Sequence, residues 1–273
     1  MGCSRRLCSR LKAVLLAPPL YVLLLGLGLM SLTWNLVSLL LHPLLPAARG
    51  RAVGRAGIAH GYRMFWAVAC ACGMMRIDAR CLAPLKDERG LIIVANHPSM
   101  LDALLLVAHL PRSACIMKAS LMKNIFLGAG ARLARYIRND SAHAMVKQAV
   151  ADLRQGGQLV IFPEATRTAQ WPLNPFTPGV TLIAKLAKAP IQTVIIDTDS
   201  PYLGKGWPLW RVPPLPVVFS LRLGERFAPQ ADSHAMTHTL EQYFRQHIDK
   251  RGDGDGAEPV PPCQQTTPAR TSS

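Results

Sequence analysis

The longest uncharged stretch of the chain restricts most strongly how it can fold. Residues 13–48 contain no Asp, Glu, Lys or Arg and are rich in Leu and Val. As one helix, these 36 residues would extend roughly 54 Å, whereas the hydrocarbon core of a bilayer is about 30 Å thick. A single straight span therefore does not fit. Pro18-Pro19, Gly26, Gly28 and His42-Pro43 offer places for a break, and we expect a membrane-embedded helical hairpin within this stretch.

The charges on both sides of this stretch indicate its orientation. Basic residues precede it at 5, 6, 10 and 12 and follow it at 49, 51 and 55. The positive-inside rule favours the cytoplasm for both flanks, and a re-entrant hairpin satisfies both. We therefore expect a monotopic or single-pass protein of the cell membrane. A second apolar stretch, 64–75, is too short to cross and would lie in the membrane interface beside Tyr62, Phe65 and Trp66.

Beyond residue 76, short apolar runs alternate with helical patterns. The runs that predict strands are 91–95, 114–117, 135–138, 159–162, 191–196 and 215–223. Helices are expected at 101–109, 142–155 (with Ser141 as N-cap), 179–189 and 232–250. This alternation predicts an α/β fold with a mixed, largely parallel sheet flanked by helices. The expected organisation is a membrane-associated helical module at 1–75, an α/β domain at 76–250 and a disordered tail at 251–273.

One motif directly after the run 91–95 places an imidazole near a carboxylate. It reads Asn96-His97-Pro98-Ser99-Met100-Leu101-Asp102. Histidine titrates near neutral pH, and a carboxylate can fix its tautomer and stabilise its cation, so this spacing suits a general base. Ser99-x-x-Asp102 is also a capping-box pattern, which explains the carboxylate by helix entry alone.

A second motif, Phe162-Pro163-Glu164-Ala165-Thr166-Arg167-Thr168, follows the run 158–161. Together the two motifs resemble those of the glycerolipid acyltransferase family, which includes the 1-acyl-glycerol-3-phosphate acyltransferases. Tyr136-Ile137-Arg138 stands where that family has a basic block, and 189–194 stands at its fourth block. The resemblance covers about residues 90–200.

The resemblance implies direct acyl transfer from a thioester to a lipid hydroxyl by a catalytic domain on the cytoplasmic face. His97 would take the proton of the acceptor hydroxyl, and Asp102 would orient the ring. Arg138 and Arg167 would bind the acceptor phosphate, and Glu164 would hold the loop or contact the glycerol. The alternative for the last pair is that Glu164 and Arg167 bind each other. The full set of substrate-binding candidates is Asn96, Lys118, Arg138, Glu164, Thr166 and Arg167.

Two residues depart from the family pattern. Ala165 stands where a glycine is usual, which tests whether the loop needs a positive φ there. Thr193 stands where the fourth block usually has a second proline. Neither position titrates, so the expected chemistry is unchanged. The acceptor could still be a specialised one, such as an aminolipid or a polyene-linked lipid, instead of 1-acyl-glycerol-3-phosphate.

The charge and the motifs together define the expected partners. The chain carries 31 basic and 16 acidic residues, a net charge of +15 that suits anionic lipids and phosphate-bearing substrates. We expect membrane lipid and either acyl-coenzyme A or acyl-carrier protein as partners, with no resident cofactor, no metal and no nucleic acid; the oligomeric state is left open. Two rival functions are a thioesterase that uses His97 and Asp102 to activate water, and a non-enzymatic, membrane-tethered basic binder.

Overall fold

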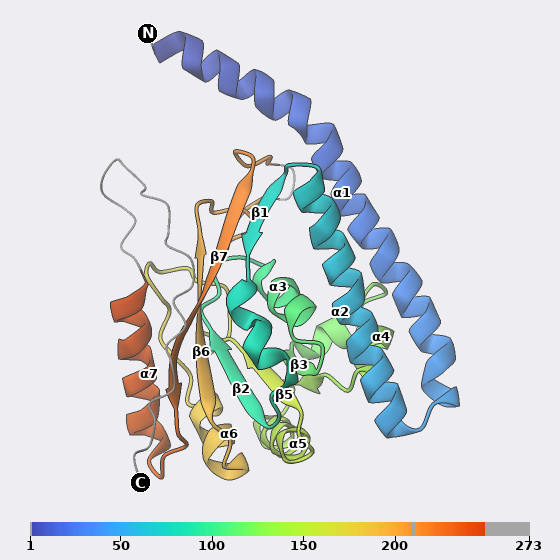
Figure 1. The fold of residues 1–273 in the computed structure, drawn as a ribbon, viewed down its shortest axis with the longest axis vertical. Helices are drawn as coiled ribbons and strands as arrows, with labels where there is room; N and C mark the ends of the chain where they lie inside the picture. The colour runs from blue at the N-terminus through green and yellow to red at the C-terminus, as the bar shows by residue number, and fades with distance from the viewer. Residues whose placement is uncertain (1, 209–210, 249–273) are drawn as a thin grey trace.

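The computed structural model describes residues 2–208 and 211–248, with side chains from residue 17 onward. Its centre is a seven-stranded sheet in the order β1-β7-β6-β2-β5-β3-β4 (Figure 1). The strands are β1 (Met75–Asp78), β2 (Leu91–Ala95), β3 (Ser113–Met117), β4 (Ile137–Arg138), β5 (Gln158–Ile161), β6 (Ile191–Thr198) and β7 (Val217–Phe227). β6 and β7 pair antiparallel and the other neighbouring pairs are parallel, which confirms the predicted mixed, largely parallel sheet.

The central strands are buried on both faces, as their unbroken apolar sequences require. In β2, residues 91, 93 and 95 face one hydrophobic core, and residues 92 and 94 face another. Strands covered on both faces are typical of parallel sheets between helical layers. The first core also contains residues of α3 (Asp102–His109) and the short helix η1 (Arg80–Asp87). The second lies under α5 (Ala142–Arg154), α6 (Gly179–Ala187) and α7 (Ser233–His247).

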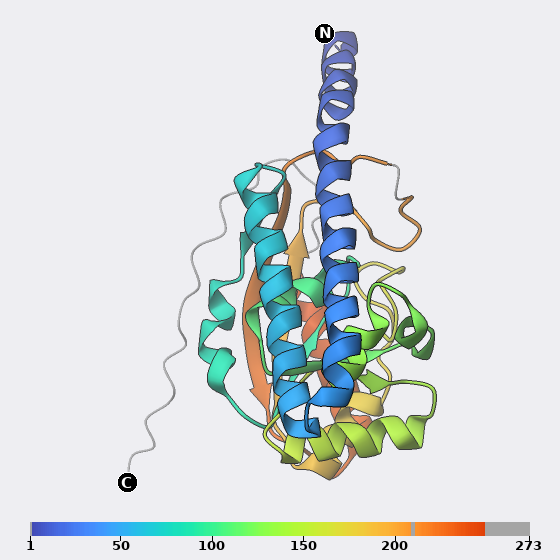
Figure 2. The same ribbon diagram turned by 90° about the vertical axis from the view of Figure 1, so that its right-hand side faces the viewer.

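The N-terminal helices differ from the hairpin that the sequence predicted. α1 runs without interruption from Gly2 to Leu44 and contains Pro18, Pro19 and Pro43. The chain reverses only afterwards, and α2 (Ala47–Ala71) returns beside α1 along one side of the domain (Figures 1 and 2). The chain therefore breaks at residues 45–46, inside the uncharged stretch and close to His42-Pro43, and not at Pro18-Pro19, Gly26 or Gly28. The second arm of the hairpin is α2, which lies almost entirely beyond residue 48. Residues 17–44 are long and apolar enough to cross a membrane.

Helix α2 is part of the domain core and does not lie apart in an interface. Phe65 and Trp66 are each only 4% exposed, and their rings contact edge to face. Trp66 also packs against Phe219 of β7. The interfacial placement predicted for these two aromatic residues is wrong, because their helix face covers the sheet.

A buried ion pair connects α2 to α5. Arg55 donates to a carboxylate oxygen of Asp152 in α5 at 2.7 Å, and also to the carbonyls of Ala134 and Arg112. A buried guanidinium needs such partners, because an unpaired buried charge is strongly destabilising. The helical hairpin and the α/β domain therefore share one packed structure. The predicted boundary at 75/76 stays a prediction, and the predicted tail at 251–273 lies outside the described residues.

Candidate functional site

His97 lies in the turn after β2, and Asp102 is the first residue of α3. The Nδ1 atom of His97 and the Oδ2 atom of Asp102 are 3.0 Å apart. The same oxygen accepts the backbone N–H of Ser99 at 2.7 Å, so Asp102 both closes the helix-entry turn and orients the imidazole. Asp102 is fully buried, and burial raises its pKa, opposed chiefly by the hydrogen bond from His97. A proton on Nδ1 donates to Oδ2 of Asp102, and Nε2 is then the basic nitrogen.

The loop after β5 holds the backbone of His97 from both sides. The N–H of His97 donates to Oε1 of Glu164 at 3.0 Å, and its carbonyl accepts the N–H of Thr168 at 2.8 Å. The imidazole also stacks on the ring of Phe162 at 4.0 Å between centroids. These contacts hold the ring in one orientation before any substrate binds, which favours catalysis by a positioned base.

Glu164 supports the loop and makes no ion pair with Arg167. Its Oε1 accepts a second hydrogen bond from the Thr168 hydroxyl, and its Oε2 accepts the N–H of Asn174. Arg167 instead donates from one nitrogen to the carbonyls of Leu203 and Gly204. The suggested pairing of Glu164 with Arg167 is therefore absent among the described residues.

The segment around Leu203 covers the histidine turn, a role that the sequence did not indicate. The carbonyl of Leu203 accepts the N–H of Met100, and the carbonyl of Tyr202 accepts the hydroxyl of Ser99. Arg167 connects this segment to the second motif. The loop that begins at Pro201 thus helps to order the turn that carries His97.

The two departures from the family pattern have clear structural settings. Ala165 has a φ of +56°, so the loop does require the left-handed conformation that glycine adopts at low cost. Thr193 is buried in β6, and its hydroxyl donates to the carbonyl of Glu225 in β7. A proline at 193 would lack this side-chain hydrogen bond between neighbouring strands.

The other candidates differ in position. Lys118 follows β3 and lies on the cavity described below, where it has no hydrogen-bond or ion-pair partner among the described residues. Arg138 is largely exposed on the edge strand β4 and pairs with Asp140. The amide of Asn96 donates to and accepts from the backbone of Ile196, so it links β2 to β6. Thr166 is exposed. The structure thus brings Lys118 to the cavity with His97 and does not bring Asn96, Arg138 or Thr166 to its wall.

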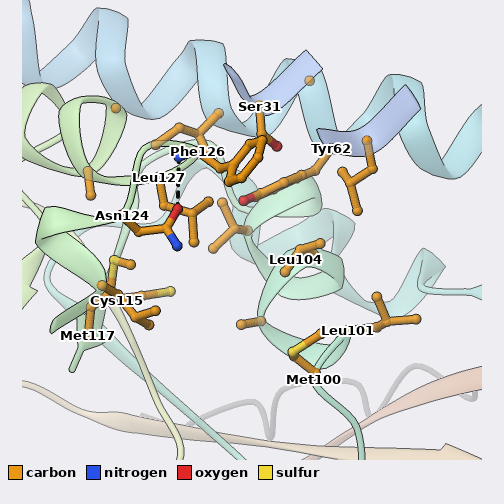
Figure 3. A pocket seen from close by; sticks show the side chains of 18 of the residues that line it. Ser31, Tyr62, Met100, Leu101, Leu104, Cys115, Met117, Asn124, Phe126 and Leu127 are labelled. Atoms are coloured by element: carbon orange, nitrogen blue, oxygen red, sulfur yellow. Dashed lines mark hydrogen bonds between the residues drawn. The ribbon is translucent and has the colours of Figure 1, made fainter. Parts of the chain in front are cut away.

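A large apolar cavity opens beside His97 (Figure 3). Its volume is about 880 Å³, and it lies between the α1–α2 hairpin and the domain, with walls from α3, β3 and α4 (Gly128–Leu133). Leu101 and Leu104 line one side and Phe126 and Leu127 another. Pockets of this size bury whole small ligands, and an apolar lining selects an apolar one. Motif reasoning missed these walls, because α1 and α2 contribute ordinary hydrophobic residues that only the tertiary fold brings together.

Fold and site together define an α/β domain with an oriented His–Asp pair facing an apolar cavity. Residues 76–197 match the Acyltransferase family model. The 1-acyl-sn-glycerol-3-phosphate acyltransferase beta of Homo sapiens is 31% identical over 140 residues, which cover 47% of this chain and 49% of that protein. The 1-acyl-sn-glycerol-3-phosphate acyltransferase of Cocos nucifera is 26% identical over 173 residues, which cover 61% of this chain and 54% of that protein. By these matches, residues 76–197 are similar to the acyltransferase domains of 1-acyl-sn-glycerol-3-phosphate acyltransferases.

A solved structure shows the same fold over a longer part of the chain. The crystal structure of the 1-acyl-sn-glycerophosphate acyltransferase PlsC from Thermotoga maritima aligns with a TM-score of 0.64 at 18% identity. The alignment covers 88% of this chain and 96% of that one, so the likeness extends well beyond the matched domain. The chain spans about half the length of the human and coconut relatives that it matches.

Proposed function

We propose that this protein transfers a fatty acyl chain from a thioester to the hydroxyl of a lysophospholipid, with 1-acyl-glycerol-3-phosphate as the default acceptor. The observation that carries the proposal is that the His97–Asp102 pair opens onto an apolar cavity large enough for a lipid chain. The match of residues 76–197 to the Acyltransferase family model supports it. The donor is an acyl-coenzyme A or an acyl-carrier protein, and no resident cofactor takes part.

The chemistry needs a single base. Nε2 of His97 removes the proton of the acceptor hydroxyl as that oxygen attacks the thioester carbonyl. The tetrahedral intermediate then collapses, the carbon–sulfur bond breaks, and the leaving thiolate takes the proton from the imidazolium. Asp102 stabilises the imidazolium while it exists, which is the part that a carboxylate plays in a serine-protease triad.

Lys118 is the best placed cation for the acceptor phosphate. β2 pairs with β5 (Val94 with Ile161), and β5 pairs with β3 (Val160 with Cys115). Lys118, which follows β3, therefore stands two strands from the His97 turn at the same edge of the sheet. Two strand spacings are roughly 10 Å, a distance that long side chains and a glycerol phosphate can bridge. The nitrogens of Arg167 that do not hold Leu203 and Gly204 supply a second site for the phosphate.

Helix α1 supports a location at the membrane. Four leucines on this helix are each more than half exposed: Leu25, Leu29, Leu40 and Leu44. An exposed apolar surface of this size is unfavourable in water and is typical of a membrane or protein contact. Ile125 and Phe126 add exposed apolar side chains beside the cavity. We propose that this surface enters the bilayer from the cytoplasmic side and that lipid substrates reach the cavity laterally.

The test uses purified full-length protein with palmitoyl-coenzyme A or palmitoyl-acyl-carrier protein and a panel of lyso-acceptors. Free thiol release and the acylated product are both measured. Thiol release that requires an acceptor and equals the product formed supports transfer. Thiol release of equal rate without any acceptor, with free palmitate as product, would instead identify a thioesterase.

A further inference from the structure

The cavity contains polar groups that the proposed transfer does not use. The hydroxyl of Tyr136 and the Nε1 atom of Trp34 are buried without a hydrogen-bond partner, and both residues line the cavity. The hydroxyl of Tyr62 points into the same cavity, toward Ser31 and Phe126 (Figure 3). A buried donor without a partner is costly, so a lone one in an apolar wall is unusual. Several in one cavity indicate an oxygen-bearing ligand.

These groups are hydrogen-bond donors at neutral pH. Burial raises the pKa of Tyr62 to about 12 and the pKa of Tyr136 well above its usual value. Both tyrosines therefore keep their protons, and the indole N–H of Trp34 is a donor in all conditions. Cys115 lies beside the two tyrosines, and burial raises its pKa to about 12 as well. The complementary ligand group is an acceptor, such as a hydroxyl or keto oxygen.

Two of the donors, Tyr136 and Trp34, lie far from the reacting histidine. Tyr21 of α1 lies near Tyr202, and the carbonyl of Tyr202 accepts the hydroxyl of Ser99 in the turn that contains His97. The part of α1 around Tyr21 is therefore at the end of the cavity where His97 lies. Trp34 lies 13 residues further along α1, which is about 20 Å at 1.5 Å per residue.

Trp34 occupies the opposite end of the cavity. There its ring fits against Gly57 of α2, and its Nε1 lies near Gly130 of α4. Tyr136 directly precedes β4, the edge strand that lies three places from β2 in the sheet, so it is roughly 14 Å from the strand that leads to His97. A chain that enters with its carbonyl at His97 would reach Tyr136 and Trp34 with its distal half.

We propose that the cavity selects a fatty chain that carries an oxygen substituent in its distal half, recognised by Tyr136 and Trp34 with Tyr62 along the path. The inference rests on the proposed acyl transfer and names the chain chemistry of the same site. The chain can belong to the thioester donor or to the lyso-acceptor. Both sources present the same chemistry to the wall.

The experiment compares palmitoyl chains that are unsubstituted, hydroxylated next to the carbonyl, hydroxylated in mid-chain or hydroxylated at the terminal carbon. One arm places the substituted chain on the donor and the other places it on the acceptor. In one of the arms we expect a mid-chain or terminal hydroxyl to raise kcat/KM about tenfold over the unsubstituted chain. A hydroxyl next to the carbonyl gives no such gain, because Tyr136 and Trp34 lie far from His97.

The variant Tyr136→Phe removes one hydroxyl and keeps the ring. We expect it to bring the ratio of kcat/KM values for the hydroxylated and plain chains close to one. Tyr202→Phe is the matched control, because it also removes a buried, unpartnered hydroxyl but lies outside the cavity wall. It keeps the preference. If Tyr136→Phe is poorly folded, Tyr62→Phe replaces it with the same expected direction.

If a distal hydroxyl raises kcat/KM in neither arm, the inference is overturned. It is also overturned if both Tyr136→Phe and Tyr62→Phe keep the preference for the hydroxylated chain. In either case the donors bind only water. Failure of the proposed function looks different, since the plain chain would then not be transferred at all.

Discussion

Glu164 is the residue whose replacement tests most sharply how the site is held together. Its carboxylate is buried and accepts three hydrogen bonds, from the N–H of His97, the hydroxyl of Thr168 and the N–H of Asn174. Glu164→Gln keeps the size of the side chain but replaces one accepting oxygen by an NH₂ group. If the remaining oxygen stays with His97, the new NH₂ faces the N–H of Asn174, donor against donor.

The magnitude follows from these contacts. One hydrogen bond to a charged group is lost, two others lose the charge that strengthens them, and a buried N–H loses its acceptor. We expect a loss of about 3 kcal/mol in the free energy of unfolding. For a chain of this size, that corresponds to a fall in Tm of roughly 6–12 °C. Because the N–H of His97 loses its anchor, we also expect turnover to fall by about 100-fold.

Thermal unfolding by circular dichroism and acyl transfer are measured on the same preparation. Glu225→Gln is the matched control, because that side chain is exposed at the end of the sheet. The control should match the wild type in both assays. A Glu164→Gln protein that melts within about 2 °C of the wild type and turns over normally would refute the role given to this carboxylate.

Three further predictions address the strained loop, the helix packing and the cavity wall. Ala165→Gly should raise the free energy of unfolding by about 0.5–1 kcal/mol, because the residue has a φ of +56°; an unchanged or lower Tm would show that the strain is absent. Gly57→Ala should lower the free energy of unfolding by about 1–3 kcal/mol, since its new Cβ would overlap the ring of Trp34; an alanine tolerated without loss would contradict the packing of α1 on α2. In the folded protein at pH 8, mass spectrometry should find that Cys115 is alkylated at least about tenfold more slowly than the exposed Cys72. The reason is that Cys115 is buried and its pKa is raised to about 12; equal rates would contradict this burial.

The sheet could be predicted from sequence because its strands are short apolar runs that end at turns. The runs at 91–95 and 159–162 agree with β2 and β5 to within a residue. The predicted cap at Ser141 is confirmed, since its hydroxyl accepts the N–H of Ala144. β1 was missed because Met75–Asp78 contains Arg76 and Asp78 and so is not an apolar run; it is a strand through its pairing with β7.

The helical hairpin was misplaced for a reason that the local sequence does not reveal. Proline residues break many helices, but α1 continues through Pro18 and Pro19. The turn comes after Leu44, and Arg55 in the next helix is buried against Asp152. Nothing near Arg55 in the sequence distinguishes it from the exposed arginines around it, because its partner lies 97 residues away.

The candidate site was predictable to the extent that it depends on local order. His97 and Asp102 are five residues apart on one turn, and a strand followed by a helix brings them together. Glu164 and Arg167 are also close in sequence, yet they bind different partners, because the loop that contains Leu203 folds over them. The cavity wall was not predictable, since it is assembled from α1, α2, α3 and α4, of which α1 and α2 lie more than 50 residues before α4 in the sequence.

The most direct test of His97 as the catalytic base is the rate at which His97→Ala acylates the acceptor. The wild type and His143→Ala, which replaces an exposed histidine, are measured beside it. All three proteins are compared at saturating donor, and their melting temperatures establish that they are folded. We expect His97→Ala to lose roughly 100-fold or more of the rate and His143→Ala to keep it. A folded His97→Ala protein that acylates the acceptor at the wild-type rate would contradict this role of His97.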